Sequence, residues 1–115
     1  MQYALLIYNP DDGTDQAQRT MDPDIAEILA LPDVTGWIRL HAAGSATTVS
    51  HREGRTLLTD GPFVDSKEFL GGLVVVEASN LDGALAVAAE LQELRPGRVV
   101  AIEVRPIRDA EISGA

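Results

Sequence analysis

The residues best suited to chemistry lie together in the middle of the chain. Asp60 ends a short stretch rich in β-branched residues, and Gly61, Pro62 and Phe63 follow it. Gly61 permits backbone conformations that other residues avoid, and Pro62 fixes its own φ, so the turn is rigid. A carboxylate held at such a turn can act as a general base, or it can accept hydrogen bonds from the backbone amides of the turn.

Few other side chains offer chemistry. Lys67 is the only lysine and Glu68 follows it, which fits either an exposed ion pair or a ligand contact. Of the two histidines, His51 stands in a turn, where we expect it to be exposed, whereas His41 can face a cleft or lie in a loop. In a cleft, His41 could exchange a proton with Asp60. The chain has no cysteine, and two histidines ten residues apart form no specific ligand set, so we expect no metal and no cofactor.

Composition sets broad limits on the function. The 115 residues fit one domain, 1–115, in which residues 110–115 form a polar tail. The net charge of −9 and the aromatic content of 4% argue against nucleic acid and anionic membranes as partners. The chain lacks an apolar run long enough to cross a membrane and a signal-peptide pattern, so we expect a cytoplasmic protein.

Two helices and several strands must position these residues. Asp22 and Pro23 are typical of a helix start, and Pro32 ends that helix near residue 31. Ser79 is the expected cap of a second helix, whose apolar stripe runs from Leu81 to Leu91. The strands are expected at residues 2–8, 36–40, 46–50, 56–59, 73–78 and 98–106, with residues 46–59 forming a hairpin.

The strands have apolar residues on both sides, although two helices can cover only one face of a sheet. Leu6, Tyr8, Val74, Val76 and Ala101 exemplify the pattern. An uncovered apolar face of this size is unusual for a monomer. A second copy of the same sheet would cover it, so we expect a homodimer joined through its sheet faces.

The order of several motifs resembles a known family. Thr47-Thr48-Val49, Gly54, Thr59 to Phe63, Ser66-Lys67-Glu68 and Leu70-Gly71-Gly72 are similar to the signature of the YCII-related family, and more narrowly to its DGPF branch. The opening Gln2 to Tyr8 and the closing Val104 to Ile107 match as well, so the resemblance spans residues 1 to 107.

The resemblance implies an α+β fold, in which a ferredoxin-like antiparallel sheet carries two helices on one face and pairs with a second copy as a dimeric α+β barrel. It also implies a cleft between helices and sheet with the Asp60 motif near it. A histidine–aspartate pair is proposed for YCII-type proteins, in which the histidine stands on the first helix. That helix contains no histidine here, so His41 is the candidate partner of Asp60.

Three functions follow from these features. We expect a small-molecule binding or regulatory protein, whose ligand-contacting candidates are Tyr8, Gly61, Pro62, Phe63, Lys67 and Glu68. The first alternative is an enzyme similar to muconolactone isomerases or dehydrochlorinases, with Asp60 and His41 transferring the proton. The second alternative, which rests on the resemblance alone, is an accessory protein of an extracytoplasmic-function sigma factor.

Overall fold

A computed structural model describes residues 1–10, 21–64, 66–94 and 98–111. In chain order its elements are β1 (Gln2–Pro10), α1 (Pro23–Leu29), β2 (Val34–Arg39), a short 3₁₀ helix η2 (Ala43–Ser45), β3 (Thr47–Arg52), β4 (Arg55–Asp60), β5 (Glu68–Glu77), α2 (Leu81–Leu94) and β6 (Ala101–Pro106). Residues 112–115 of the expected tail lie outside the described residues.

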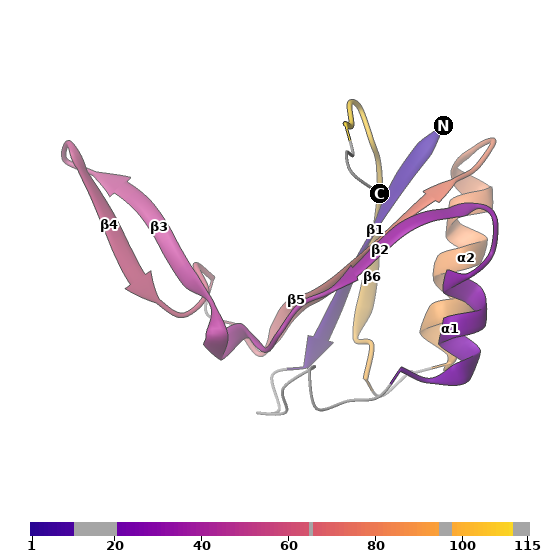
Figure 1. Cartoon of the computed structure of the whole chain (residues 1–115), viewed down its shortest axis with the longest axis horizontal. Helices are drawn as coiled ribbons and strands as arrows, with labels where there is room; N and C mark the ends of the chain where they lie inside the picture. The colour runs from indigo at the N-terminus through magenta and orange to yellow at the C-terminus, as the bar shows by residue number, and fades with distance from the viewer. Residues whose placement is uncertain (11–20, 65, 95–97, 112–115) are drawn as a thin grey trace.

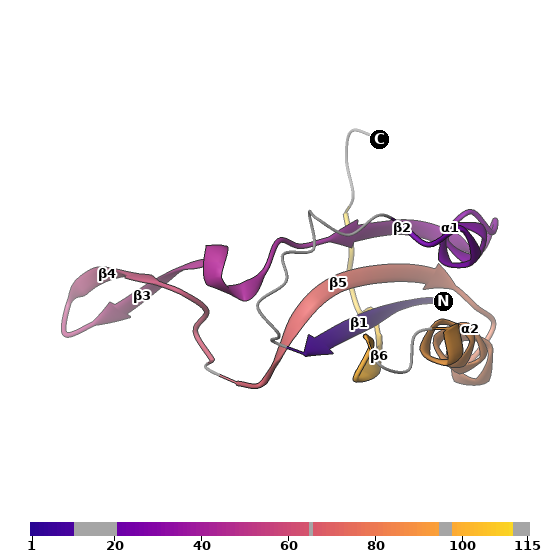
Figure 2. The same cartoon turned by 90° about the horizontal axis from the view of Figure 1, so that it is seen from below.

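Four strands form one antiparallel sheet in the order β2-β5-β1-β6. Both helices lie on the same side of this sheet, as Figures 1 and 2 show. Each helix follows a strand and leads into another, which with this strand order gives a ferredoxin-like α+β fold. The fold class expected from the sequence is therefore confirmed. No helix in the described ranges is long and apolar enough to cross a membrane.

Strand alternation builds the core on the helix side of the sheet. Along β1, Tyr3 and Leu5 are buried and pair with Val76 and Val74 of β5, which are buried as well. Leu29 of α1, together with Ala84, Ala88 and Leu91 of α2, completes this cluster. The opposite face of the sheet, which we call the open face, is covered by neither α1 nor α2.

The two helix starts differ in how well the sequence predicts them. Asp22 caps α1 as expected, because its carboxylate accepts a hydrogen bond from the amide of Asp24 at 2.8 Å. The expected cap at Ser79 is wrong. The Asn80 side-chain oxygen accepts from the amide of Gly83 at 3.1 Å, three residues into the turn, which is the geometry of an N-cap at Asn80.

Strands β3 and β4 form a separate two-stranded hairpin, which we call the arm (residues 47–60). The arm is inserted between β2 and β5 and projects from the body on the side of the sheet away from the helices (Figure 1). All six residues of β4 are exposed. Largely because of this projection, the molecule measures 45 × 32 × 26 Å.

Two strands differ most in extent from the expectation. β5 begins at Glu68 rather than Leu73, because its first residues pair with the end of β1. The pairing shifts by one residue between Ile7 and Tyr8, which leaves Gly71 as an extra residue opposite this step. β6 is shorter than expected and begins at Ala101.

Candidate functional site

A cavity lies between the sheet and the helices near the start of α1. The space between its walls is about 790 Å³, counted out to open solvent. The walls come from every layer of the body: Ile7 and Asn9 of β1; Trp37, Ile38 and Arg39 of β2; Gly71, Gly72 and Val74 of β5; Met21, Asp22, Ile25 and Leu29 around α1; Leu91 of α2; and Arg98 and Val99 before β6. Most of these side chains are apolar, so the cavity suits an apolar molecule.

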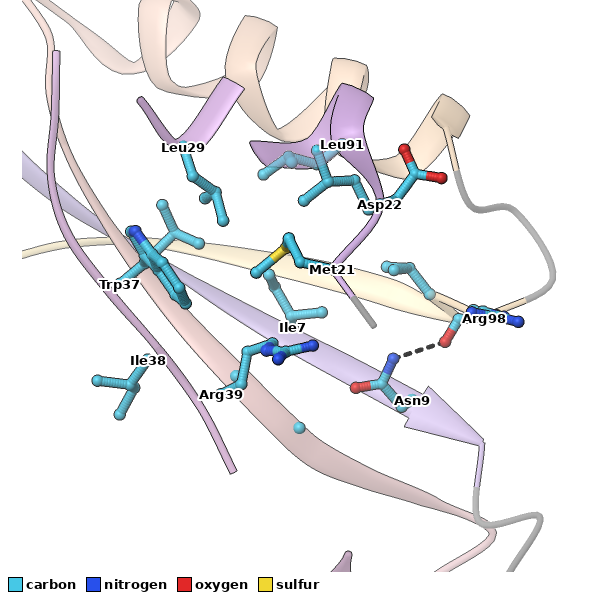
Figure 3. Close-up of a pocket in the computed structure, with 15 residues that line it drawn as sticks. Ile7, Asn9, Met21, Asp22, Leu29, Trp37, Ile38, Arg39, Leu91 and Arg98 are labelled. Carbon is cyan, nitrogen blue, oxygen red and sulfur yellow. Dashed lines mark hydrogen bonds between the residues drawn. The ribbon is translucent and has the colours of Figure 1, made fainter. Parts of the chain in front are cut away.

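Strand β2 contributes the two most distinctive side chains of the cavity. Trp37 and Arg39 are two residues apart, so they point to the same side of the strand, and Figure 3 shows both turned toward the cavity. Ile38 between them points the other way, onto the open face. The register agrees, because Trp37 pairs with Val74 and Arg39 pairs with Gly72 on the helix side of β5.

A glycine leaves room beside Arg39. Gly72 lies between Ile7 of β1 and Arg39 of β2 in the sheet, on the face that the helices cover. A Cβ atom added to Gly72 would stand 3.0 Å from the backbone oxygen of Ile38, so the strands pack too closely for a larger residue. The missing side chain therefore serves both the close strand packing and the open space above it.

Polar groups lie toward the end of the cavity where β1 finishes (Figure 3). Asn9 is a buried polar residue, and its side-chain amide donates to the backbone oxygen of Arg98 at 2.6 Å. The Gln92 side chain of α2 donates to the backbone oxygen of Val99 at 2.6 Å, which ties the same segment to the helix. These two bonds fix the wall that Arg98 and Val99 form.

The cavity can hold an apolar body and an acceptor group at the same time. Trp37 and the aliphatic side chains supply contact area, and the guanidinium of Arg39 supplies up to five N–H donors. That number allows Arg39 to keep a protein partner and still donate to a ligand. Carboxylates match the planar, forked geometry of a guanidinium particularly well.

None of the expected site residues lines this cavity. Asp60 ends β4, so Asp60, Gly61, Pro62 and Phe63 lie where the arm rejoins the body. The side chain of Phe63 is 79% exposed and forms no part of the cavity wall. The cleft implied by the resemblance is present, but its wall contains Gly71 and Gly72 from the motif rather than the Asp60 turn.

Backbone groups close the turn at Asp60. The amide of Gly61 donates to the backbone oxygen of Ala46 at 2.7 Å, and the Thr48 hydroxyl donates to the backbone oxygen of Gly61 at 2.8 Å. Gly61 has a φ of +96°, which confirms the need for glycine there. Within the described ranges, no hydrogen bond or ion pair reaches the carboxylate of Asp60, which is exposed. The expected bonds from Asp60 to the backbone amides are therefore not part of this turn.

The other expected ligand contacts lie near the junction of β1 and β5. Tyr8 is on the open face, with its hydroxyl oxygen 3.5 Å from a carboxylate oxygen of Glu103. Glu68 pairs with Pro10 at the start of β5, and both Lys67 and Glu68 are exposed. The sheet therefore separates Tyr8 from the cavity.

The histidines lie in two different places. His41 is exposed and follows β2 on the way to η2, whereas His51 is exposed near the tip of the arm, as expected. His41 does not line the cavity that Trp37 and Arg39 share. In the part of the chain that the structure describes, no three histidine or acidic side chains gather as a metal site.

The sequence contained a signal for the cavity residues. Asn9 continues the odd-numbered face of β1 on which Tyr3, Leu5 and Ile7 lie, so a buried polar residue could be expected at its end. The alternation of β2 similarly places Trp37 and Arg39 on one side. Sequence analysis missed both because neither residue type marks a recognised motif.

Comparisons with known proteins identify the family of the chain. A profile of the YCII-related domain matches residues 1–108. A protein of Rhizobium meliloti (strain 1021), described as uncharacterised, is 31% identical over 115 aligned positions, which cover 93% of this chain and 92% of the relative. The chain therefore belongs to the YCII-related domain family.

Proposed function

We propose that the chain binds a small organic acid in the cavity between its sheet and its helices. The observation that carries this proposal is the placement of Trp37 and Arg39 on one side of β2, both facing an otherwise apolar space. The apolar body of the ligand packs against Trp37, and its carboxylate accepts hydrogen bonds from Arg39. This assignment refines the small-molecule binding expected from the sequence and moves it away from the Asp60 turn.

Trp37 provides a direct readout, because it is the only tryptophan of the chain and its side chain is 46% exposed. A ligand in the cavity removes water from the indole and shifts its fluorescence. Phenylacetate, which joins an apolar ring to a carboxylate, is a suitable probe. Phenylacetamide is the control, because it has a similar shape but no charge. We expect a saturable change with phenylacetate and binding at least about tenfold weaker for the amide, because a hydrogen bond to a charged partner is stronger than a neutral one.

Two arginine variants complete the test. Arg39→Gln should remove the preference for the carboxylate. Arg108→Gln is the matched control, because the Arg108 side chain is 96% exposed and lies outside the cavity. The absence of a saturable signal with millimolar phenylacetate would contradict the proposal, as would equal effects of the two substitutions.

Catalysis by Asp60 and His41 has weaker support. Both side chains are exposed, so water competes for their hydrogen bonds, and neither lines the cavity between the sheet and the helices. Neither the described residues nor the comparisons favour the enzyme or the sigma-factor partner. Binding without a reaction is therefore the function that we propose.

We further propose a homodimer joined through the open face. Ile38, Leu6 and Leu73 lie side by side across three strands of that face, and Ile38 is 52% exposed. Burying such a patch favours association, because apolar surface leaves water. Sedimentation equilibrium should give twice the chain mass of 12.3 kDa, or about 25 kDa.

One substitution on each side of the sheet tests the proposed interface. Ile38→Lys should dissociate the dimer, since it buries a charge at the centre of the patch. Leu85→Lys is the control, because Leu85 is an exposed leucine of α2 on the helix side. A wild-type chain that sediments as a monomer at micromolar concentration would exclude the dimer.

A further inference from the structure

Among the described residues, none provides a hydrophobic layer over the arm. It is a two-stranded hairpin separate from the main sheet, and such a hairpin is at best marginally stable alone in water. The four most exposed large apolar side chains of the described residues all belong to the arm or to the turn after it. They are 66–79% exposed: Val49, Leu58, Phe63 and Val64.

The apolar side chains of the arm form one pair on one face. Val49 of β3 is directly opposite Leu58 of β4. Leu57 points to the other face, where it is opposite Ser50 and is only 40% exposed. The face of Val49 and Leu58 is therefore the one that lacks a covering layer.

From these observations we propose that the arm is a clasp for a second copy of this chain, with its Val49–Leu58 face buried on that copy. This inference rests on the homodimer proposed above and adds a second contact to it. The arm lies on the same side of the body as the open face (Figures 1 and 2), so a copy docked on that face comes within reach of the arm.

The exposed surface area of the chain is large for its mass. The chain exposes 8001 Å². A compact monomer of 12.3 kDa exposes roughly 6,100 Å² by the mass-scaling law. The excess is larger than the roughly 800 Å² that one partner contributes to a protein interface of standard size. The surface that the chain exposes therefore has room for an interface of standard size.

The charge of the arm favours a copy of the same chain as partner. Arg52 and Arg55 are directly opposite each other at the tip, and two like charges in that position repel. The chain as a whole is acidic, with a net charge of −9. The acidic surface of a second copy offers carboxylates to both arginines, and this attraction is local to the arm tip, because two whole chains of the same net charge repel each other.

A pair of neighbouring leucines provides the test. Leu58→Thr should raise the dissociation constant of the dimer at least about tenfold, since the substitution occurs twice in a two-fold dimer. Leu57→Thr makes the same chemical change on the other face of β4 and should have a much smaller effect. Val49→Thr, which is nearly isosteric, should act in the same direction as Leu58→Thr. Sedimentation equilibrium measures all three, and the emission of Trp37 reports whether the body remains folded.

The sign of a charge substitution is a second test. Arg55→Gln should weaken the dimer if the arm tip meets an acidic partner. If the tip meets only solvent, the substitution relieves the repulsion from Arg52 and leaves the dimer unchanged. A wild-type dimer unaffected by Leu58→Thr and Val49→Thr would overturn the clasp while leaving the sheet-face dimer in place, and a monomeric wild type would overturn both.

Discussion

The body and the arm use the same kinds of residues with opposite results. Leu5 and Val76 of the main sheet are fully buried, because two helices cover their side of the strands. Leu58 and Val49 also alternate along paired strands, yet they are 72% and 66% exposed. The difference lies in the second layer, which α1 and α2 supply for the body and which none of the described residues supplies for the arm.

The contrast between body and arm limits what apolar alternation along a strand can predict. The pattern indicates that one face of a strand needs to leave water, but not which chain supplies the cover. In the body the cover is α1 and α2. For the arm we infer that it comes from a second copy, so substitutions in the two regions should differ in how their effects depend on protein concentration.

The largest contrast is expected between Leu5→Ala and Leu58→Ala. Leu5→Ala should lower the free energy of unfolding by about 2–5 kcal/mol, because it leaves a cavity in the core. At concentrations where the chain is a monomer, Leu58→Ala should change that free energy by less than about 0.5 kcal/mol. Urea unfolding followed by Trp37 emission measures both. A comparable loss from Leu58→Ala in the monomer would mean that the arm packs on its own body.

A smaller effect should separate two glycines of the body. Gly72→Ala places a Cβ atom 3.0 Å from the Ile38 backbone oxygen and should cost about 1–3 kcal/mol through local overpacking. Gly36→Ala meets nothing within 4 Å and should be neutral or slightly stabilising. Thermal unfolding of the two variants compares them. Equal melting temperatures would mean that the strands around the cavity adjust easily.

The start of α2 should show an effect of about 1 kcal/mol. Asn80→Ala removes the hydrogen bond to the amide of Gly83 and should destabilise the body by that amount. Ser79→Ala should leave the stability unchanged, because Ser79 does not hold the cap. Denaturation curves in which Ser79→Ala is the less stable variant would instead support the cap at Ser79 that the sequence predicts.

The smallest effect is expected at Asp60, the last residue of the arm. Asp60→Ala and Asp60→Asn should both stay within about 0.5 kcal/mol of the wild type, because backbone groups close the turn and the carboxylate is exposed. Melting curves test this expectation. A loss of 1 kcal/mol or more in Asp60→Ala, rescued by Asp60→Asn, would show that the side chain accepts backbone hydrogen bonds after all.

The sequence predicts the body better than the candidate site. Alternation in residues 2–8, the cap at Asp22 and the two strand–helix–strand units lead correctly to the α+β fold, because these signals are local. The cavity depends on residues from several elements, such as Asn9, Arg39 and Gly72, which meet only when the sheet forms. The N-cap of α2 is Asn80 rather than Ser79. Both residue types can cap a helix, so the sequence did not distinguish the two adjacent positions, and only the backbone conformation does.

The Asp60 motif shows a different limit. The rigid turn was predicted correctly from Gly61, whose φ is positive. The exposure of the Asp60 carboxylate was not predicted, because a sequence motif does not show whether its side chains point to a cleft or to solvent. Phe63 illustrates the same limit, since the sequence singles it out as a ligand contact and the structure exposes it outside the cavity.

Hydrogen exchange across a dilution series tests the central contrast between body and arm most directly. At a concentration where the chain is a dimer, amides in both regions should be protected. On dilution below the dissociation constant, peptides covering the arm (residues 47–60) should lose protection, while those from β1 and β5 should keep it, because only the arm depends on a second copy. Arm protection that is independent of concentration would contradict the account.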